Sequence, residues 1–398
     1  MGDINQINDV AAANISQVND VAKANISEVN DQGVPASGAT RWSVATQDGH
    51  FMYAANSDLT SWTAYDSYDE GSTGQSGGDG KSIAFGKNAS GQSIYMATRA
   101  TANGGSQTKE IHISGTDVTS TSEWTNVDID GDSNSRNTIM MLRWAADSGG
   151  SAAGVWMAVG KQATGDIFRS TNGGSSWTAI DISGLTGHVS GSASSDYINA
   201  IASDGLGNWM FGQDSRIYYS SNNGQTWAVS TPFSTNAPGR FQSIVYTNNS
   251  WVICYSRQSQ IRFRSCAASD ITDWGDEVTN HNQQMAHITA NGKAVKMCAA
   301  NGKVWAVSED DFDVNRFDVS GKVISNIANF DLDDIADLKV AQDIATDGVK
   351  VVVACRSGDL AVSTNLGVSF TATLDAFQAD GSNTKDLEAV TADVILPL

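Results

Sequence analysis

The chain has 398 residues, and its 44 acidic residues outnumber its 24 basic residues, which gives a formal net charge of −20. This balance argues against binding to a nucleic-acid backbone, which needs basic residues to displace counterions, and against docking on an anionic membrane surface. A hydrophobic fraction of 40% and 11 tryptophans argue against disorder. We therefore expect a folded protein that binds no nucleic acid and inserts into no membrane.

The N-terminus carries an eleven-residue repeat. Residues 8–18 read NDVAAANISQV and residues 19–29 read NDVAKANISEV. Apolar residues recur at steps of three and four, as on one face of a helix with about 3.67 residues per turn. The pattern predicts a hendecad coiled-coil helix over residues 1–32, with oligomerisation through Ile4, Ile7, Ala11, Ile15, Val18, Ala22, Ile26 and Val29.

So narrow an apolar face needs identical neighbours to become stable, so we expect a homo-oligomer. A parallel homotrimer is our first expectation, with a dimer or tetramer left open. The alternative is a single amphipathic helix lying on the rest of the protein. The segment GVPASG at residues 33–38 stops a helix, and we expect residues 33–39 to be a linker. No secretory signal precedes the repeat, so we expect synthesis in a host cytoplasm.

Three segments of the region 40–398 share the pattern Ser-x-Asn-x-Gly-x-x-aromatic. They resemble the Asp-box of sialidase-like (BNR) β-propellers, with Asn in place of Asp. The resemblance implies a hairpin turn between the third and fourth strands of a blade, in which Ser and Asn close the turn, Gly takes a strained conformation and the aromatic ring fills the space between blades. The residues are Ser170, Asn172, Gly174 and Trp177; Ser220, Asn222, Gly224 and Trp227; and Ser363, Asn365, Gly367 and Phe370.

The spacing of the aromatic residues predicts the number of blades. Trp62, Trp124, Trp177, Trp227 and Trp274 follow one another at intervals of 47 to 62 residues, and a further 96 residues lead to Phe370. Counting that last interval as two blades predicts an all-β fold, a seven-bladed β-propeller over residues 40–398. The first blade lacks one strand, which we expect the C-terminal run 387–396 to supply, because radial closure covers exposed sheet edges.

We find no support for enzymatic chemistry in the sequence. The Arg-Ile-Pro motif of sialidases is absent, and no spacing arranges Arg41, Arg99, Arg143 and Arg356 as a triad. No pair of carboxylates stands out as the two that a glycosidase needs. The histidines form no metal-binding cluster. We therefore expect a non-enzymatic protein without a catalytic residue or a bound metal.

One acidic segment leaves open whether the protein binds calcium. Asp128, Asp130 and Asp132 alternate as the ligands of calcium loops do, but the loop lacks the glycine and the terminal glutamate of an EF-hand. Calcium binding is the alternative to a solvated turn.

The N-terminal repeats look like those of tail-fibre and virion appendage proteins of bacteriophages. The resemblance implies a virion structural protein, a trimeric fibre or spike that contacts other virion proteins through its N-terminal helix and binds a host surface receptor, such as a glycan, with its propeller. A capsid or neck decoration protein of the virion is the nearest alternative, and a sialidase-like glycan hydrolase is the alternative of another class. A photosynthetic assembly factor of the Asp-box type fits less well, because such proteins are exported.

Receptor binding by loops would use exposed aromatic and polar side chains, whose rings stack on sugars and whose polar groups fix orientation. Two loops carry such residues, and we expect the binding site among Tyr65, Asp66, Tyr68, Asp69, Asn236 and Arg240.

Overall fold

The regular elements of the described chain are β-strands and two single-turn 3-10 helices, η7 (Leu332–Asp334) and η8 (Arg356–Gly358). The computed structural model describes residues 17–18, 21–22, 39–46, 51–65, 81–98, 110–115, 124–129, 138–161, 166–186, 198, 200–213, 216–230, 241–257, 260–279, 295–308, 312–374 and 386–393. Among these residues, no helix is long and apolar enough to cross a membrane.

Strands that follow one another in the chain pair as antiparallel neighbours, and the described strands of the ring make seven four-stranded sheets. Six of these sheets each use four consecutive strands. They are β6 (Ile83–Lys87), β7 (Ser93–Thr98), β8 (Glu110–Ile113) and β9 (Thr125–Asp128); β10 (Thr138–Ala145), β11 (Val155–Lys161), β12 (Asp166–Ser170) and β13 (Thr178–Asp181); β14 (Ala200–Ser203), β15 (Trp209–Gln213), β16 (Arg216–Ser220) and β17 (Ala228–Ser230); β18 (Phe241–Thr247), β19 (Ser250–Arg257), β20 (Gln260–Ala267) and β21 (Val278–Thr279); β22 (Val295–Ala300), β23 (Lys303–Ser308), β24 (Asp313–Ser320) and β25 (Val323–Asp331); and β26 (Ala341–Thr346), β27 (Val351–Cys355), β28 (Leu360–Ser363) and β29 (Thr371–Thr373).

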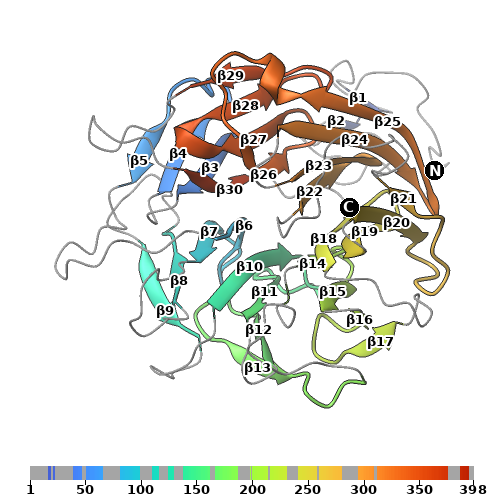
Figure 1. Ribbon diagram of the computed structural model, residues 1–398. Coiled ribbons are helices and arrows are strands. Elements are labelled where there is room, and N and C mark those ends of the chain that lie inside the picture. Colours follow the sequence, from blue (N-terminus) through green and yellow to red (C-terminus); the bar gives the residue numbers. More distant parts are fainter. Residues whose placement is uncertain are drawn as a thin grey trace.

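The remaining sheet joins the two ends of the ring. It contains β30 (Leu387–Ala392), β3 (Arg41–Thr46), β4 (Phe51–Ala55) and β5 (Thr63–Tyr65) in that order. β30 is antiparallel to β3, with Trp42 opposite Ala392 and Val44 opposite Val390. The expected closing strand near the C-terminus is therefore confirmed. The sheets surround a common axis, with the first strand of each sheet nearest the centre, so the all-β propeller fold is confirmed (Figure 1).

Local sequence explains the tight turns between strands. Asn248 and Asn249, between β18 and β19, have φ of 47° and 53°, and Asn301 and Gly302, between β22 and β23, have φ of 53° and 74°. Positive φ at both central positions is the geometry of a type I′ two-residue hairpin turn, and Asn and Gly tolerate this conformation best. The strands themselves are apolar, and every residue of β27 is buried.

The hydrophobic core lies between neighbouring sheets, where each cluster combines side chains from two of them. Tryptophans on second strands form its most deeply buried part: Trp42, Trp156, Trp209, Trp251 and Trp305 have at most 1% of their surface exposed. The aromatic rings that were expected to fill the space between blades are less uniform. Trp227 and Phe370 are buried, but Trp62, Trp177 and Trp274 only partly so.

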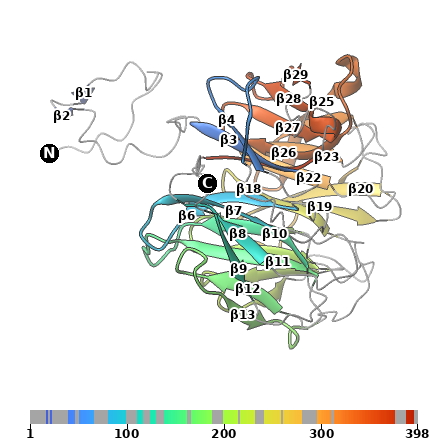
Figure 2. The same ribbon diagram turned by 90° about the vertical axis from the view of Figure 1, so that its left-hand side faces the viewer.

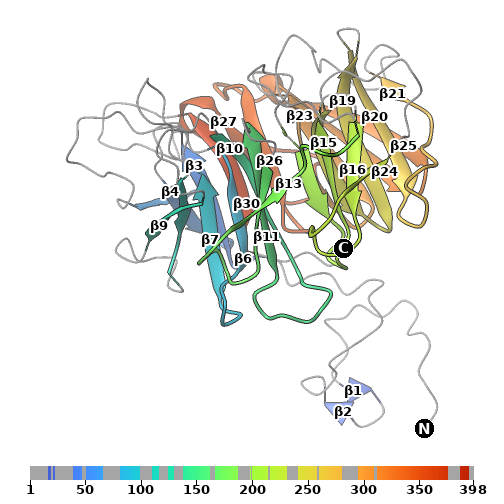
Figure 3. The same cartoon turned by 90° about the horizontal axis from the view of Figure 1, so that it is seen from below.

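The helix expected over residues 1–32 is wrong where the structure describes this segment. β1 (Gln17–Val18) and β2 (Val21–Ala22) form an antiparallel pair, so Val18 and Ala22 of the expected apolar face lie on strands outside the ring (Figures 2 and 3). A narrow apolar face buries little surface without identical neighbours, whereas a hairpin pairs backbone groups within one chain. Outside the described residues are the linker residues 33–38 and Ile4, Ile7, Ala11, Ile15, Ile26 and Val29.

Candidate functional site

The three Ser-x-Asn-x-Gly turns lie between the third and fourth strands of their sheets and use one hydrogen-bond pattern. In the first, Ser170 Oγ accepts from the backbone N of Gly174 at 2.9 Å and donates to Asn172 Oδ1 at 2.9 Å. The oxygen of Asn172 also accepts from Ser176 N at 3.0 Å. The turns at Ser220 and Ser363 repeat these bonds within 0.1 Å.

The glycines of these turns contact the preceding sheet. A Cβ atom at Gly174 would lie 2.3 Å from Met96 Cε, and one at Gly367 would lie 2.4 Å from Trp305 Nε1. Trp305 Nε1 in turn donates to Leu366 O at 3.1 Å. These contacts therefore hold adjacent sheets together, which is a structural role.

The loop residues expected to bind a receptor are untested. Of Tyr65, only the backbone is described, at the end of β5, while Asp66, Tyr68, Asp69, Asn236 and Arg240 lie outside the described residues. The same is true of the calcium hypothesis, since only the backbone of Asp128 is described and Asp130 and Asp132 lie outside. Among the described side chains, no group of three or more His, Cys, Asp or Glu residues could hold a metal ion.

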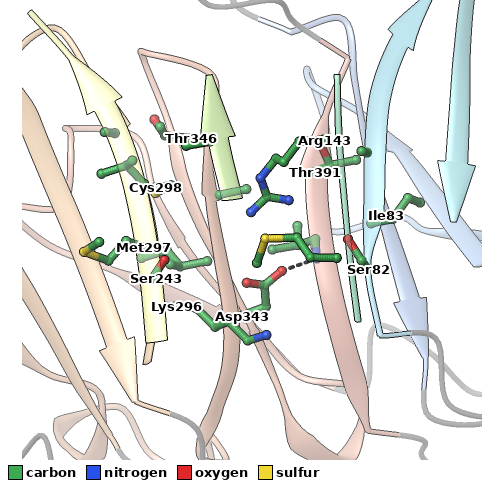
Figure 4. A pocket seen from close by; sticks show the side chains of 18 of the residues that line it. Ser82, Ile83, Arg143, Ser243, Lys296, Met297, Cys298, Asp343, Thr346 and Thr391 are labelled. Carbon is green, nitrogen blue, oxygen red and sulfur yellow. Dashed lines mark hydrogen bonds between the residues drawn. The ribbon is translucent and has the colours of Figure 1, made fainter. Parts of the chain in front are cut away.

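A cavity of about 270 Å³ lies on the axis of the ring, and we call it the axial cavity. It is lined by residues from the first strand of all seven sheets or from the residues next to these strands. Figure 4 shows three charged side chains in it, Arg143 from β10, Lys296 from β22 and Asp343 from β26. The axial cavity thus collects charged groups that are far apart in the sequence.

Arg143 is half-buried and points into the axial cavity (Figure 4). Its Nη1 donates to the backbone O of Leu142 at 2.9 Å. Burial lowers the pKa of this guanidinium from its usual value, and the charge of Asp343 acts in the opposite direction. Because an arginine pKa starts far above neutrality, the side chain remains a cation that has lost much of its contact with solvent.

Asp343 is held on the opposite side of the cavity by the closing strand. Its Oδ2 accepts from the backbone N of Val390 at 2.9 Å, so this carboxyl also ties β26 to β30. The pairing of β26 with β27 shifts register between Ala341 and Asp343, and such a bulge can re-aim a side chain. Burial raises the pKa of Asp343, while Lys296, the backbone bond from Val390 and Arg143 oppose this rise.

The rest of the cavity wall mixes hydroxyl groups with sulfur-containing and aliphatic side chains. Cys298 lies on β22 beside Lys296, and burial raises its pKa well above the usual value, with Asp343 adding to the rise. A thiol with a raised pKa stays protonated and is a poor nucleophile. The labelled side chains of Figure 4 also include Ser82, Ile83, Ser243, Met297, Thr346 and Thr391.

The four arginines considered in the sequence do not meet at one site where they are described. Arg143 lines the axial cavity, whereas Arg41 lies over the ring of Tyr53 at 5.2 Å and Arg356 faces Asp386, with 3.6 Å between Nε and Oδ2. Arg99 lies outside the described residues. An arginine triad is therefore absent from the described part of the ring.

Sequence reasoning missed the axial cavity as a site. Lys296 and Asp343 were not singled out, although each interrupts an otherwise apolar strand, in VKMCAA and AQDIAT. A charged residue inside a buried strand is uncommon and is a signal that could have found them. Chemically, the arrangement is suited to holding a small charged ligand, because desolvated charges at fixed positions interact strongly with a counter-charge.

Comparisons with known proteins bear on the fold alone. No protein-family model and no curated protein matches this chain. Among solved structures, a YCF48 bound to a D1 peptide is 11% identical with a TM-score of 0.51, covering 83% of this chain and 92% of its own. A streptogramin B lyase is 13% identical with a TM-score of 0.51, covering 76% and 85%. The propeller domain of Cps50 (Swd1) from Myceliophteria thermophila is 8% identical with a TM-score of 0.50, covering 83% and 97%. This chain is therefore similar in fold to propellers of differing roles, and fold does not determine function.

Proposed function

We propose that this protein is a non-enzymatic structural protein of a bacteriophage virion, a trimeric fibre or spike whose propeller binds a receptor such as a glycan on the host surface. The N-terminal repeats assemble the copies and attach them to other virion proteins. The proposal is supported by the resemblance of the repeats to those of virion appendage proteins and by the way the chain joins the ring.

The observation that carries the proposal is a clasp where the chain enters and leaves the ring. The carboxylate of Asp393, which follows β30, accepts from the backbone N atoms of Thr40 and Arg41 at 2.7 and 2.8 Å. Asp347, in the turn after β26, accepts from the backbone N of Ala39 at 3.2 Å. The chain is therefore fixed to two different sheets immediately after residue 38.

The clasp lies on one face of the ring. Thr40 O accepts from the backbone N of Asn56, which begins the turn between β4 and β5, and Asp347 belongs to a turn between a first and a second strand. Turns of these two kinds lie on the same face of a sheet of alternating strands. An attachment through the repeats would hold the ring by this face and leave the opposite face available to a receptor.

Multivalency would strengthen receptor binding by such an assembly. Three propellers on one attachment gain avidity over a single weak site without any new contact, provided that their spacing allows simultaneous binding. A fibre or spike that meets a repetitive cell surface satisfies this condition.

Immunogold electron microscopy of the virus that encodes this chain tests the proposal. Serum raised against the ring should label the tail or its tip on intact particles. Labelling of the head or neck would contradict the receptor-binding role and favour decoration of the capsid or neck. Particles that carry no gold, although the serum detects the purified protein, would overturn the virion assignment.

A further inference from the structure

Two opposite charges face the axial cavity without touching each other. Arg143 on β10 and Asp343 on β26 both line it, and Figure 4 shows their charged ends directed into the same space. Each charge acts on the other, but no nitrogen of the described Arg143 side chain lies within 4.0 Å of an oxygen of Asp343. The other charged residues of the described lining have partners of their own, because Lys81 pairs with Glu388 and Lys296 has a separate interaction. The cavity therefore presents one cation and one anion, held apart.

Neither of these two charges has a counter-charge in contact with it among the described residues. Arg143 donates one hydrogen bond, to the backbone O of Leu142, and Asp343 accepts from the backbone N atoms of Val390 and Ile344. Burial lowers the pKa of Arg143 and raises the pKa of Asp343, so burial disfavours the charged form of both groups. A buried charge that is hydrogen-bonded to neutral groups alone gains stability when a counter-charge reaches it.

The two side chains select complementary chemical groups. The guanidinium of Arg143 has five N–H donors in a planar fork, and two parallel donors match the two oxygens of a carboxylate. The carboxylate of Asp343 accepts hydrogen bonds, and an ammonium group supplies three donors together with a positive charge. A ligand that carries both groups would therefore compensate both buried charges at once.

The size and the other walls of the cavity limit the rest of the ligand. A volume of about 270 Å³ lies just below the usual range for small-molecule pockets, so the ligand must be compact. Apolar side chains that would cover an aliphatic body line the same space, among them Met141, Met297, Ile83 and Ile344. We propose that the axial cavity binds a small aliphatic zwitterion, with its carboxylate on Arg143 and its ammonium group on Asp343.

The paired charges also exclude ligands that carry a single charge. A monocarboxylate would contact Arg143 but bring a second negative charge near Asp343, and an alkylammonium ion would bring a second positive charge near Arg143. Specificity therefore comes from repulsion as well as from attraction. The site does not depend on the proposed virion function, because it uses the ring alone.

Titration of the full-length protein with matched ligands tests the inference, in a buffer free of carboxylates and amines. The zwitterions are glycine, β-alanine and γ-aminobutyrate, which differ in the spacing of their charges, and butyrate and butylammonium each carry one charge of γ-aminobutyrate. Binding is followed by isothermal calorimetry and by changes in ligand NMR signals. We expect at least one zwitterion to bind about ten- to a hundredfold more tightly than butyrate or butylammonium, the gain of one hydrogen bond to a charged group.

Two substitutions should separate the two ends of the ligand. Arg143→Gln should weaken zwitterion binding about ten- to a hundredfold without weakening butylammonium binding. Asp343→Asn should weaken zwitterion binding to a similar extent without weakening butyrate binding. The matched controls are Arg356→Gln and Asp334→Asn, outside the cavity, which should leave all affinities unchanged.

The crossed pattern distinguishes ligand contacts from a structural role. The oxygen of an asparagine at position 343 can still accept from Val390 N, so we expect that variant to remain folded, and circular dichroism checks both variants. Three results would overturn the inference: wild-type protein that binds none of the three zwitterions, wild-type protein that binds butyrate or butylammonium as tightly as the best zwitterion, or zwitterion binding that neither cavity substitution weakens.

Discussion

The outer turns and the axial cavity place polar groups in the same ring by different means. The Ser-x-Asn-x-Gly turns satisfy their polar atoms within a few residues, as when Ser220 Oγ accepts from Gly224 N. The cavity instead brings together Arg143 and Asp343, which are 200 residues apart in the chain. The turns depend on local sequence, and the cavity depends on closure of the whole ring. Substitutions in the two regions should therefore differ in how much stability they remove and in how much of the ring they affect.

Removing the closing strand should have the largest effect. A chain that ends after residue 385 lacks β30 and with it Leu387 and Val390, which are at least 95% buried. It also leaves Asp343 without the Val390 donor and exposes the edge of β3. Each lost apolar side chain costs about 1.5–3 kcal/mol, so we expect the ring to lose cooperative thermal unfolding. Calorimetry that found an unchanged transition would show that closure does not hold the ring together.

Adding a side chain at the glycine of a turn should have the next largest effect on stability. Gly367 has φ of 73°, and an added Cβ would lie 2.4 Å from Trp305 Nε1. Gly367→Ala should lower the free energy of unfolding by about 2–4 kcal/mol, from backbone strain and from overpacking. Gly184→Ala is the control, because its Cβ would have no atom within 4 Å and should change stability by less than about 0.5 kcal/mol. Equal losses in urea unfolding would contradict the sheet-to-sheet contact.

Removing one turn hydroxyl should have a smaller effect. Ser220→Ala leaves the backbone N of buried Gly224 without its acceptor and should cost about 1–2 kcal/mol. Ser221→Ala, at the exposed neighbouring position, is the matched comparison. If chemical denaturation gave the same midpoint for both variants, the local hydrogen bonds would not stabilise the turn.

The smallest expected effect is a pH dependence from Glu277. Burial alone would raise its pKa, but hydrogen bonds from Tyr255 and Arg262 outweigh burial, and its pKa lies below 4.5. The ionised carboxylate is favoured in the folded state, so its contribution is complete above pH 4.5 and is lost as pH falls through the lowered pKa. Glu277→Gln should flatten the pH dependence of the melting temperature between pH 5 and about 3. The free energy of unfolding that this carboxylate contributes over that range should be less than about 1 kcal/mol. A wild-type profile that the substitution leaves unchanged would contradict this.

Local and long-range determinants explain which features could be predicted from the sequence. The Ser-x-Asn-x-Gly segments indicate their own turns, because their hydrogen bonds span four residues. The missing strand beside Trp42 indicated a closing strand, since an open edge needs a partner. The repeat around Val18 and Ala22 predicted a helix instead of the described strands. The apolar face of that helix requires identical neighbours, which a single chain lacks. Lys296 and Asp343 escaped notice because only the ring brings their strands together.

The central claim is that the propeller binds a receptor on the host surface, and adsorption competition tests it most directly. Host cells are incubated with the purified full-length protein before the virus is added, and free virus is counted over time. The account predicts that adsorption slows as protein concentration rises, while heat-unfolded protein has no effect. Adsorption that stays at the uninhibited rate when folded protein is present in large excess would contradict it.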